Sequence, residues 1–173
     1  PGLDPFGETC STCLAPDYDR CLVRLSRGGA DAAELREFDV PSKTFVDGFY
    51  VPEAKSSLAW SDANTLRVST DWGEGALTDS GYPRIVKRGT RGTPLDDAET
   101  GYEGATSDVG VWAASVRMGT ASIPLIAHRP SCFEGTTYVL RDGAPGALDL
   151  PRDAYPSLVD GQLVVYLRSP GTV

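Results

Sequence analysis

His128 is the only histidine among the 173 residues, so any chemistry that needs an imidazole must use it. A hydrolytic triad requires that histidine beside an activated serine or cysteine, with a carboxylate to orient it. The Gly-x-Ser-x-Gly pentapeptide that builds the nucleophile elbow of α/β-hydrolases does not occur in the sequence. His128 also lies in an alternating apolar run, residues 123–129, which is typical of a strand. We therefore interpret it as a strand or loop histidine and predict no catalytic residue.

The cysteines allow three interpretations. Cys10 and Cys13, Cys21, and the pair His128 and Cys132 together offer five soft ligands, of which zinc would use four. A single Cys-x-x-Cys is weak evidence for such a site, because a structural zinc normally needs a second close pair. Cys10 and Cys13 could alternatively form a redox pair or disulfide. The simplest interpretation is four thiols with Cys21 buried in its strand, and we predict no metal and no cofactor.

Two acidic clusters, residues 17–19 and 96–99, could bind cations or act as acid and base. Neither has the alternating oxygen ligands, central glycine and final glutamate of a calcium loop. We expect solvated turns, since Asp and Glu are usually exposed. The segment 73–75 is too short and misplaced for a dinucleotide loop.

Aromatic side chains could line a sugar-binding face, and the candidates are Trp60, Trp72 and Trp112 together with the tyrosines. Their positions in expected strands favour core packing instead, because buried rings contribute large apolar areas.

Composition excludes several classes of function. The formal net charge of −8 and the pI near 4.6 argue against nucleic acid, which requires a basic stripe to neutralise phosphates. No run approaches the roughly 18 apolar residues of a membrane span, and the N-terminus lacks a signal core. A reducing cytoplasm is the expected location. The chain starts at Pro1 and stops at Val173 without a capping element, so we expect both ends to be cuts through a longer chain.

Apolar residues alternate with a period of two along most of the chain, which predicts strands. The expected strands are residues 20–26, 35–40, 44–50, 58–60, 65–72, 82–87, 97–102, 109–116, 123–129, 136–141, 147–150 and 162–168. A turn at Asp160 and Gly161 precedes the last of them. Comparable strands begin at residues 20, 65, 123 and 163, which are 45, 58 and 40 residues apart. A repeat of about 40–50 residues with four strands is the signature of a β-propeller.

We therefore predict an all-β fold, a partial β-propeller of about three to four blades of antiparallel four-stranded sheet. The blades would span residues 16–52, 53–104, 105–152 and an incomplete 153–173, after a separate cysteine-containing segment at 1–15. A blade has two apolar faces and cannot bury both alone, so its neighbours must cover them. The open flank of the arc then predicts either further chain or a homodimer through exposed blade edges.

Seven segments, residues 16–20, 25–31, 36–39, 52–56, 70–71, 77–84 and 88–95, resemble the propeller domain of the prolyl oligopeptidase family of serine peptidases. The resemblance extends over most of residues 16–170. It implies a propeller that caps an α/β-hydrolase domain of the same parent chain, in which a Ser-Asp-His triad cleaves peptides. The propeller would admit short peptides and exclude folded proteins. Because the triad of that family lies outside the matched region, none of its residues can be assigned here.

The expected function is accordingly a non-catalytic propeller segment that limits the access of peptide substrates to an active site in a separate hydrolase domain. This segment alone would be inactive. The alternative is a stand-alone β module that binds a peptide or carbohydrate through its loops.

Overall fold

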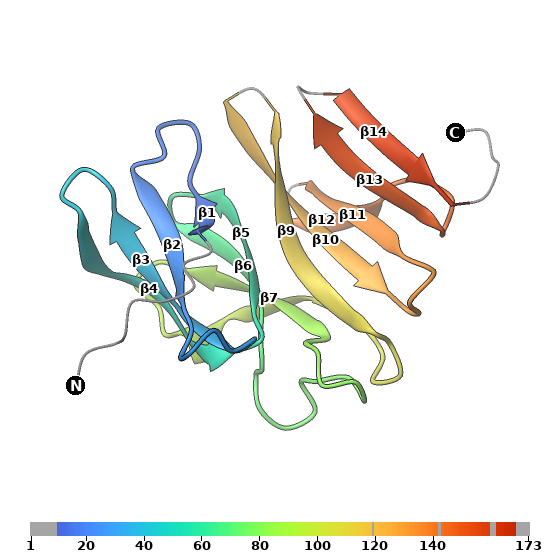
Figure 1. Ribbon diagram of the computed structural model, residues 1–173, viewed down its shortest axis with the longest axis horizontal. Helices are drawn as coiled ribbons and strands as arrows, with labels where there is room; N and C mark the ends of the chain where they lie inside the picture. The colour runs from blue at the N-terminus through green and yellow to red at the C-terminus, as the bar shows by residue number, and fades with distance from the viewer. Residues whose placement is uncertain (1–9, 119, 142, 160–161, 169–173) are drawn as a thin grey trace.

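The computed structural model describes residues 10–118, 120–141, 143–159 and 162–168, and its strands form four antiparallel sheets (Figure 1). The first sheet contains β1 (Cys10–Cys13), β2 (Arg20–Leu25), β3 (Ala33–Asp39) and β4 (Thr44–Ala54). The second contains β5 (Ser57–Asp62), β6 (Thr65–Ser69), β7 (Ile85–Thr90) and β8 (Glu99–Glu103), with the 3-10 turn η1 (Leu95–Asp97) before β8. The all-β fold is confirmed.

The third sheet contains β9 (Gly110–Met118), β10 (Ala121–Arg129), β11 (Thr136–Arg141) and β12 (Ala144–Ala147). The fourth has two described strands, β13 (Ala154–Val159) and β14 (Gln162–Leu167). In every sheet each strand pairs with the next one along the chain. The expected turn at Asp160 and Gly161 lies outside the described residues, as do residues 1–9 and 169–173.

The four sheets follow one another around an arc. Their first strands are in contact in chain order: β1 with β5, β5 with β9, and β9 with β13. Figure 1 shows this succession as a fan of sheets from blue to red across the view. Up-and-down sheets packed radially on their first strands are the arrangement of propeller blades.

The second sheet is covered on both faces, and β6 shows how. All five of its residues are buried. Leu66 and Val68 pack with Leu22, Leu35 and Trp60 in the core between the first two sheets. The alternate residue Ser69 points the other way and donates a hydrogen bond to the Val111 carbonyl of the third sheet at 2.6 Å. Because side chains alternate between the two faces of a strand, β6 contributes residues to the packing on both sides of its sheet.

A second core fills the boundary between the second and third sheets. Its members are small or aliphatic side chains from both sheets: Ala59, Val86, Val111, Ala113, Ile126 and Leu140. The pattern agrees with the expectation that blades cover one another's apolar faces.

A buried ion pair joins the first sheet to the second. Glu37 of β3 is fully buried, and its carboxylate accepts two hydrogen bonds from the Arg91 guanidinium, at 2.9 and 3.0 Å. The Phe49 amide donates to the same carboxylate at 2.8 Å. Gly48 leaves room for this approach, because a Cβ there would overlap the Glu37 carboxylate. Arg91 also donates to the Ala63 carbonyl and lies 4.7 Å above the Phe49 ring.

Three details, one in each of the first three sheets, differ from the sequence prediction. β1 lies in the segment for which no strand was expected, and it pairs with β2. β12 comes directly after β11 rather than at residues 147–150, because the chain turns before Ala144, where Gly143 takes a φ of 83°. β7 begins at Ile85, not at residue 82, since Leu77 and Pro83 form an isolated bridge of their own.

Loss of the buried ion pair should destabilise the protein strongly. We expect Arg91→Leu to lower the free energy of unfolding by about 3 kcal/mol, because Glu37 would remain buried without its main partner. Urea denaturation followed by tryptophan fluorescence measures this change. The control is Arg27→Gln, which breaks an exposed pair with Glu53 and should cost less than about 1 kcal/mol. Equal effects of the two substitutions would contradict the role given to Arg91.

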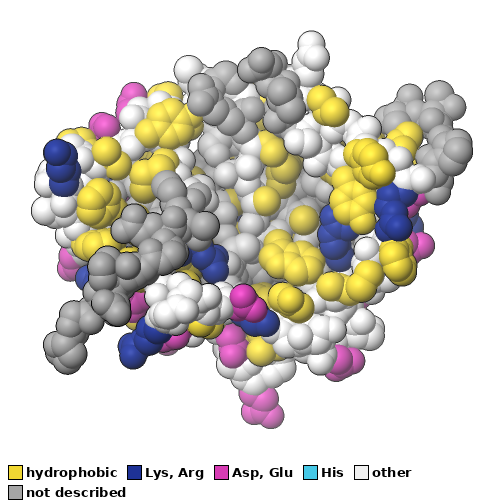
Figure 2. All heavy atoms as spheres, in the orientation of Figure 1, with side chains coloured by type: hydrophobic (Ala, Val, Ile, Leu, Met, Phe, Trp, Pro, Cys, Tyr) yellow, Lys and Arg dark blue, Asp and Glu magenta, His cyan; other side chains and the backbone are white. Residues whose placement is uncertain are grey.

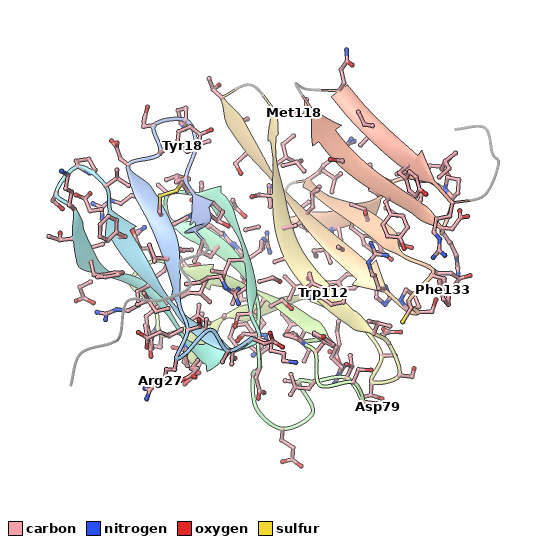
Figure 3. The ribbon with its side chains drawn as sticks, in the orientation of Figure 1. Tyr18, Arg27, Asp79, Trp112, Met118 and Phe133 are labelled. Atoms are coloured by element: carbon pink, nitrogen blue, oxygen red, sulfur yellow. A yellow bond between two sulfur atoms is a disulfide. The ribbon has the colours of Figure 1, made fainter. Side chains whose placement is uncertain are left out.

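Cys13 and Cys21 form a disulfide that fastens β1 to β2, drawn as a yellow bond in Figure 3. We expect Cys13→Ser, or a reducing agent, to lower the free energy of unfolding by about 2–3 kcal/mol, the value for a short closed loop. Urea denaturation with and without reductant tests this. The exposed thiol Cys132 provides the control, since Cys132→Ser should keep the response to reductant. If the unsubstituted 173-residue chain unfolded identically with and without reductant, the disulfide would be refuted.

Candidate functional site

The first strands of the sheets form a shallow groove of about 380 Å³ that crosses β1, β5 and β9. Small and hydroxyl-bearing side chains contribute most of its wall: Thr12, Ser56, Ser57, Ala113, Ala114 and Ser115. Arg24 and two leucines complete the lining. A wall of small side chains leaves the space beside these strands open, which suits an extended chain better than a bulky rigid ligand.

The hydroxyl groups of the groove also connect neighbouring strands. Ser57 of β5 accepts a hydrogen bond from the Ala113 amide of β9 at 2.9 Å. The Ser56 and Thr70 hydroxyls lie 2.6 Å apart. In addition, the Trp60 indole N–H donates to the Thr12 carbonyl of β1 at 2.9 Å. These bonds fix the relative positions of the three strands and so hold the groove in shape.

A second hollow of about 300 Å³ shares Arg24 and Ser56 with the groove and carries charged and aromatic groups. Lys55 lies 4.7 Å above the Tyr82 ring, and the Tyr82 and Trp112 rings are 6.0 Å apart. Trp112 is labelled on β9 near the middle of Figure 3, and Figure 2 shows hydrophobic side chains exposed in the same region. We call Lys55, Tyr82 and Trp112 the aromatic rim.

His128 stands apart from this groove, in a hydrogen-bonded chain between the second and third sheets. Its Nε2 lies 2.8 Å from Asp108 Oδ2, and its Nδ1 lies 2.8 Å from the Tyr102 hydroxyl. A carboxylate can only accept, so Nε2 carries the proton and Nδ1 accepts from Tyr102. Asp108 in turn accepts from the Ala105 amide at 2.6 Å. Both ring nitrogens are therefore occupied.

Tyr102 is the group whose proton affinity this network changes most clearly. Burial raises the pKa of Tyr102 above its ordinary value, and the hydrogen bond with Tyr138 and the negative charge of Asp108 raise it further. The Tyr102 ring also packs against His128 and Tyr138, with ring centroids 5.6 and 4.9 Å away. Tyr102 therefore keeps its proton more firmly than an ordinary tyrosine does, and its ring contributes to the packing between the second and third sheets.

The structure corrects the interpretation of the cysteines. Cys13 and Cys21 were expected as thiols, or Cys13 as the partner of Cys10, but they are bonded to each other. The reason is that β1 pairs with β2 and places Cys13 directly opposite Cys21. Cys132 is an exposed thiol, and the side chain of Cys10 lies outside the described residues. Within the described ranges, no three His, Cys, Asp or Glu side chains are grouped as metal ligands.

The acidic and aromatic candidates are placed as follows. Asp17, Asp19, Asp96, Asp97 and Glu99 are all exposed, which agrees with solvated turns. Trp60 is fully buried and Trp72 packs against the same core, so core packing is confirmed for both.

Trp112, in contrast, is half-buried and belongs to the aromatic rim. Sequence reasoning did not single out Lys55 or Tyr82, because only the fold brings residues 27 or more positions apart to one edge.

Comparisons with known proteins now bear on this geometry. No family model matches the chain. An uncharacterized peptidase, y4nA, of Sinorhizobium fredii (strain NBRC 101917 / NGR234) is 45% identical over 98 residues, which are 56% of this chain and 14% of that protein. The structure of a post-proline cleaving enzyme from Rickettsia typhi superposes with a TM-score of 0.78 and 21% identity, covering 86% of this chain and 24% of that one.

The chain has the fold of a prolyl oligopeptidase propeller segment. Two further solved structures agree. One comes from a study of two prolyl endopeptidases (TM-score 0.64, 16% identity, 85% of this chain and 22% of that one), and the other is oligopeptidase B from Leishmania major (0.63, 12%, 91% and 22%). This propeller segment thus spans about a quarter or less of the proteins it matches. In the described part of the chain, no helix is long and apolar enough to cross a membrane.

The raised pKa of Tyr102 gives a prediction for alkaline solution. The unfolded tyrosine loses its proton near its ordinary pKa of 10, whereas the folded one holds it to higher pH. The unfolded state therefore binds fewer protons above pH 10, and stability falls as the pH rises through that value. We expect Tyr102→Phe to reduce the fall in urea midpoint between pH 9 and pH 11. The exposed Tyr166 gives the control, since Tyr166→Phe should leave the fall unchanged. Parallel curves for all three proteins would contradict the assignment.

Proposed function

We propose that the chain is a non-catalytic propeller segment of a prolyl oligopeptidase-like serine peptidase, which limits the access of peptide substrates to an active site in a separate hydrolase domain. The observation that carries the proposal is the radial order of the sheets, whose first strands β1, β5, β9 and β13 meet in succession. The post-proline cleaving enzyme from Rickettsia typhi has the same fold over 86% of this chain. The relation to a peptidase over 98 residues supports the same conclusion.

The groove on the first strands suits this role. Its small side chains would leave passage for an extended peptide, and the charged and aromatic groups of the rim would meet that peptide first. The rigid wall excludes bulky folded proteins by size, because the strands are fixed to one another by hydrogen bonds. The proposal gives His128 no catalytic role, and its two ring nitrogens are hydrogen-bonded to Tyr102 and Asp108.

The proposal includes a partner, the α/β-hydrolase domain of the same parent chain, and peptides as substrates. We also propose that the four sheets are successive blades. The final strand β14 exposes Leu163 on one face and Val164 and Tyr166 on the other, and a further blade or a second copy of the chain would cover the outward face.

The first test is hydrolysis. We expect the 173-residue chain to leave a chromogenic proline-containing peptide intact, whereas the parent protein with its hydrolase domain cleaves it. Activity in the short chain that survives repurification would reject the proposal. Saturable binding of the peptide to the short chain, with an inactive parent, would favour the stand-alone binding module.

The second test addresses access. In the parent protein, Ser115→Trp should place a large ring in the groove and lower kcat/KM about tenfold for long peptides, with a smaller effect on dipeptide substrates. The matched control is Ser42→Trp, in an exposed turn of the first sheet. Equal losses for long and short substrates would show that the groove does not select by length.

A further inference from the structure

Arg67 brings a positive charge into the packed boundary between the second and third sheets. It lies in β6, on the face opposite Leu66 and Val68, and is 5% exposed. Its Nε has no hydrogen-bond partner among the described residues, and no described carboxylate lies within 4 Å of its guanidinium. A buried guanidinium without a partner costs free energy, so its retention needs a reason.

The guanidinium of Arg67 lines an open groove of about 640 Å³ between these two sheets. Two glycines leave space beside it. A Cβ built on Gly101 of β8 would lie 3.2 Å from Nη1, and one on Gly143 would lie 3.7 Å from Nη2. Gly101 has no positive φ that would require glycine. A side chain at position 101 would crowd the Arg67 guanidinium, and this is the physical reason we find for a glycine there.

The groove is lined by two positive and two negative side chains, but neither carboxylate lies within 4 Å of the Arg67 guanidinium. Arg88 and Glu99 pair with each other at 3.7 Å, and Asp62 adds a second carboxylate to the wall. Burial is the largest cause that lowers the pKa of Arg67, and the neighbouring Arg88 lowers it further. A ligand with one negative charge beside the guanidinium would offset both the burial of Arg67 and its repulsion by Arg88. A ligand with two negative charges would also be repelled by the carboxylates of Asp62 and Glu99.

We propose that this groove is a binding site for a singly charged organic carboxylate, held by the Arg67 guanidinium. A planar carboxylate matches the fork of N–H donors of an arginine guanidinium. The apolar part of the ligand would lie against Pro124 and Leu140, which line the opposite wall. The site shares no lining residue with the groove on the first strands and does not depend on the proposed role in a peptidase.

The test uses isobutyrate as the probe and the 173-residue chain labelled with nitrogen-15. At constant ionic strength and pH 7, we expect isobutyrate to shift the Nε–Hε resonance of Arg67 in a saturable way. The uncharged analogue isobutyramide has nearly the same shape and should leave this resonance in place. Inorganic phosphate should bind at least about tenfold more weakly, because its second charge meets Asp62 and Glu99. Tighter binding of phosphate would overturn the choice of a carboxylate.

Variants locate the site. Arg67→Met removes the Arg67 resonance itself, so binding to this variant is followed by the backbone amide shifts of Thr65, Thr100 and Gly101 in the groove, which should show no saturable response to isobutyrate. Arg27→Gln, which removes an exposed guanidinium, should bind isobutyrate as the unsubstituted chain does. If Arg67→Met does not fold, Gly101→Ala decides, because its methyl group would crowd Nη1 and should weaken binding about tenfold. No saturable shift in the parent, an equal response to isobutyramide, or unchanged affinity in the variant that folds would overturn the proposal.

Discussion

The requirement that a β-sheet with two apolar faces be covered on both sides determines this structure. The second sheet meets the requirement in full, because the first sheet packs on Leu66 and Val68 while the third packs on Val86 and Ala59. Within this packing, the buried pair of Glu37 and Arg91 fixes how the first sheet lies on the second. A buried ion pair adds less stability than an apolar contact of the same volume, but its geometry permits one arrangement and penalises others.

Much of the fold could be predicted from the sequence because strands have a simple period. The run at 65–69 alternates strictly between polar and apolar residues, and the run at 123–129 begins with five apolar residues; both are strands. β1 was missed because four residues, Cys10–Cys13, are too few to show a period and are small or polar. β12 was misplaced because Asp142-Gly143, a common hairpin signal, outweighed the later apolar residues 147–150.

The burial and the partners of the polar side chains between the sheets could not be predicted from the sequence in the same way. Arg67 alternates with apolar neighbours like any exposed strand residue, and its burial follows from the third sheet that lies over it. The same holds for Glu37, whose partner Arg91 is 54 residues away. His128 was predicted to be a strand residue outside a triad, but its partners Tyr102 of β8 and Asp108 of the loop before β9 meet it only because the second and third sheets pack together.

Because each sheet touches its neighbours in chain order, loss of structure can proceed from one end without disturbing the other. The final pair of strands, β13 and β14, rests on the rest of the molecule chiefly through β9, while the second sheet is held from both sides. Amide protons should accordingly exchange with solvent in a gradient, fastest at the red end of Figure 1 and slowest in β6. The protein would then unfold sheet by sheet from its C-terminal end rather than as a single cooperative unit.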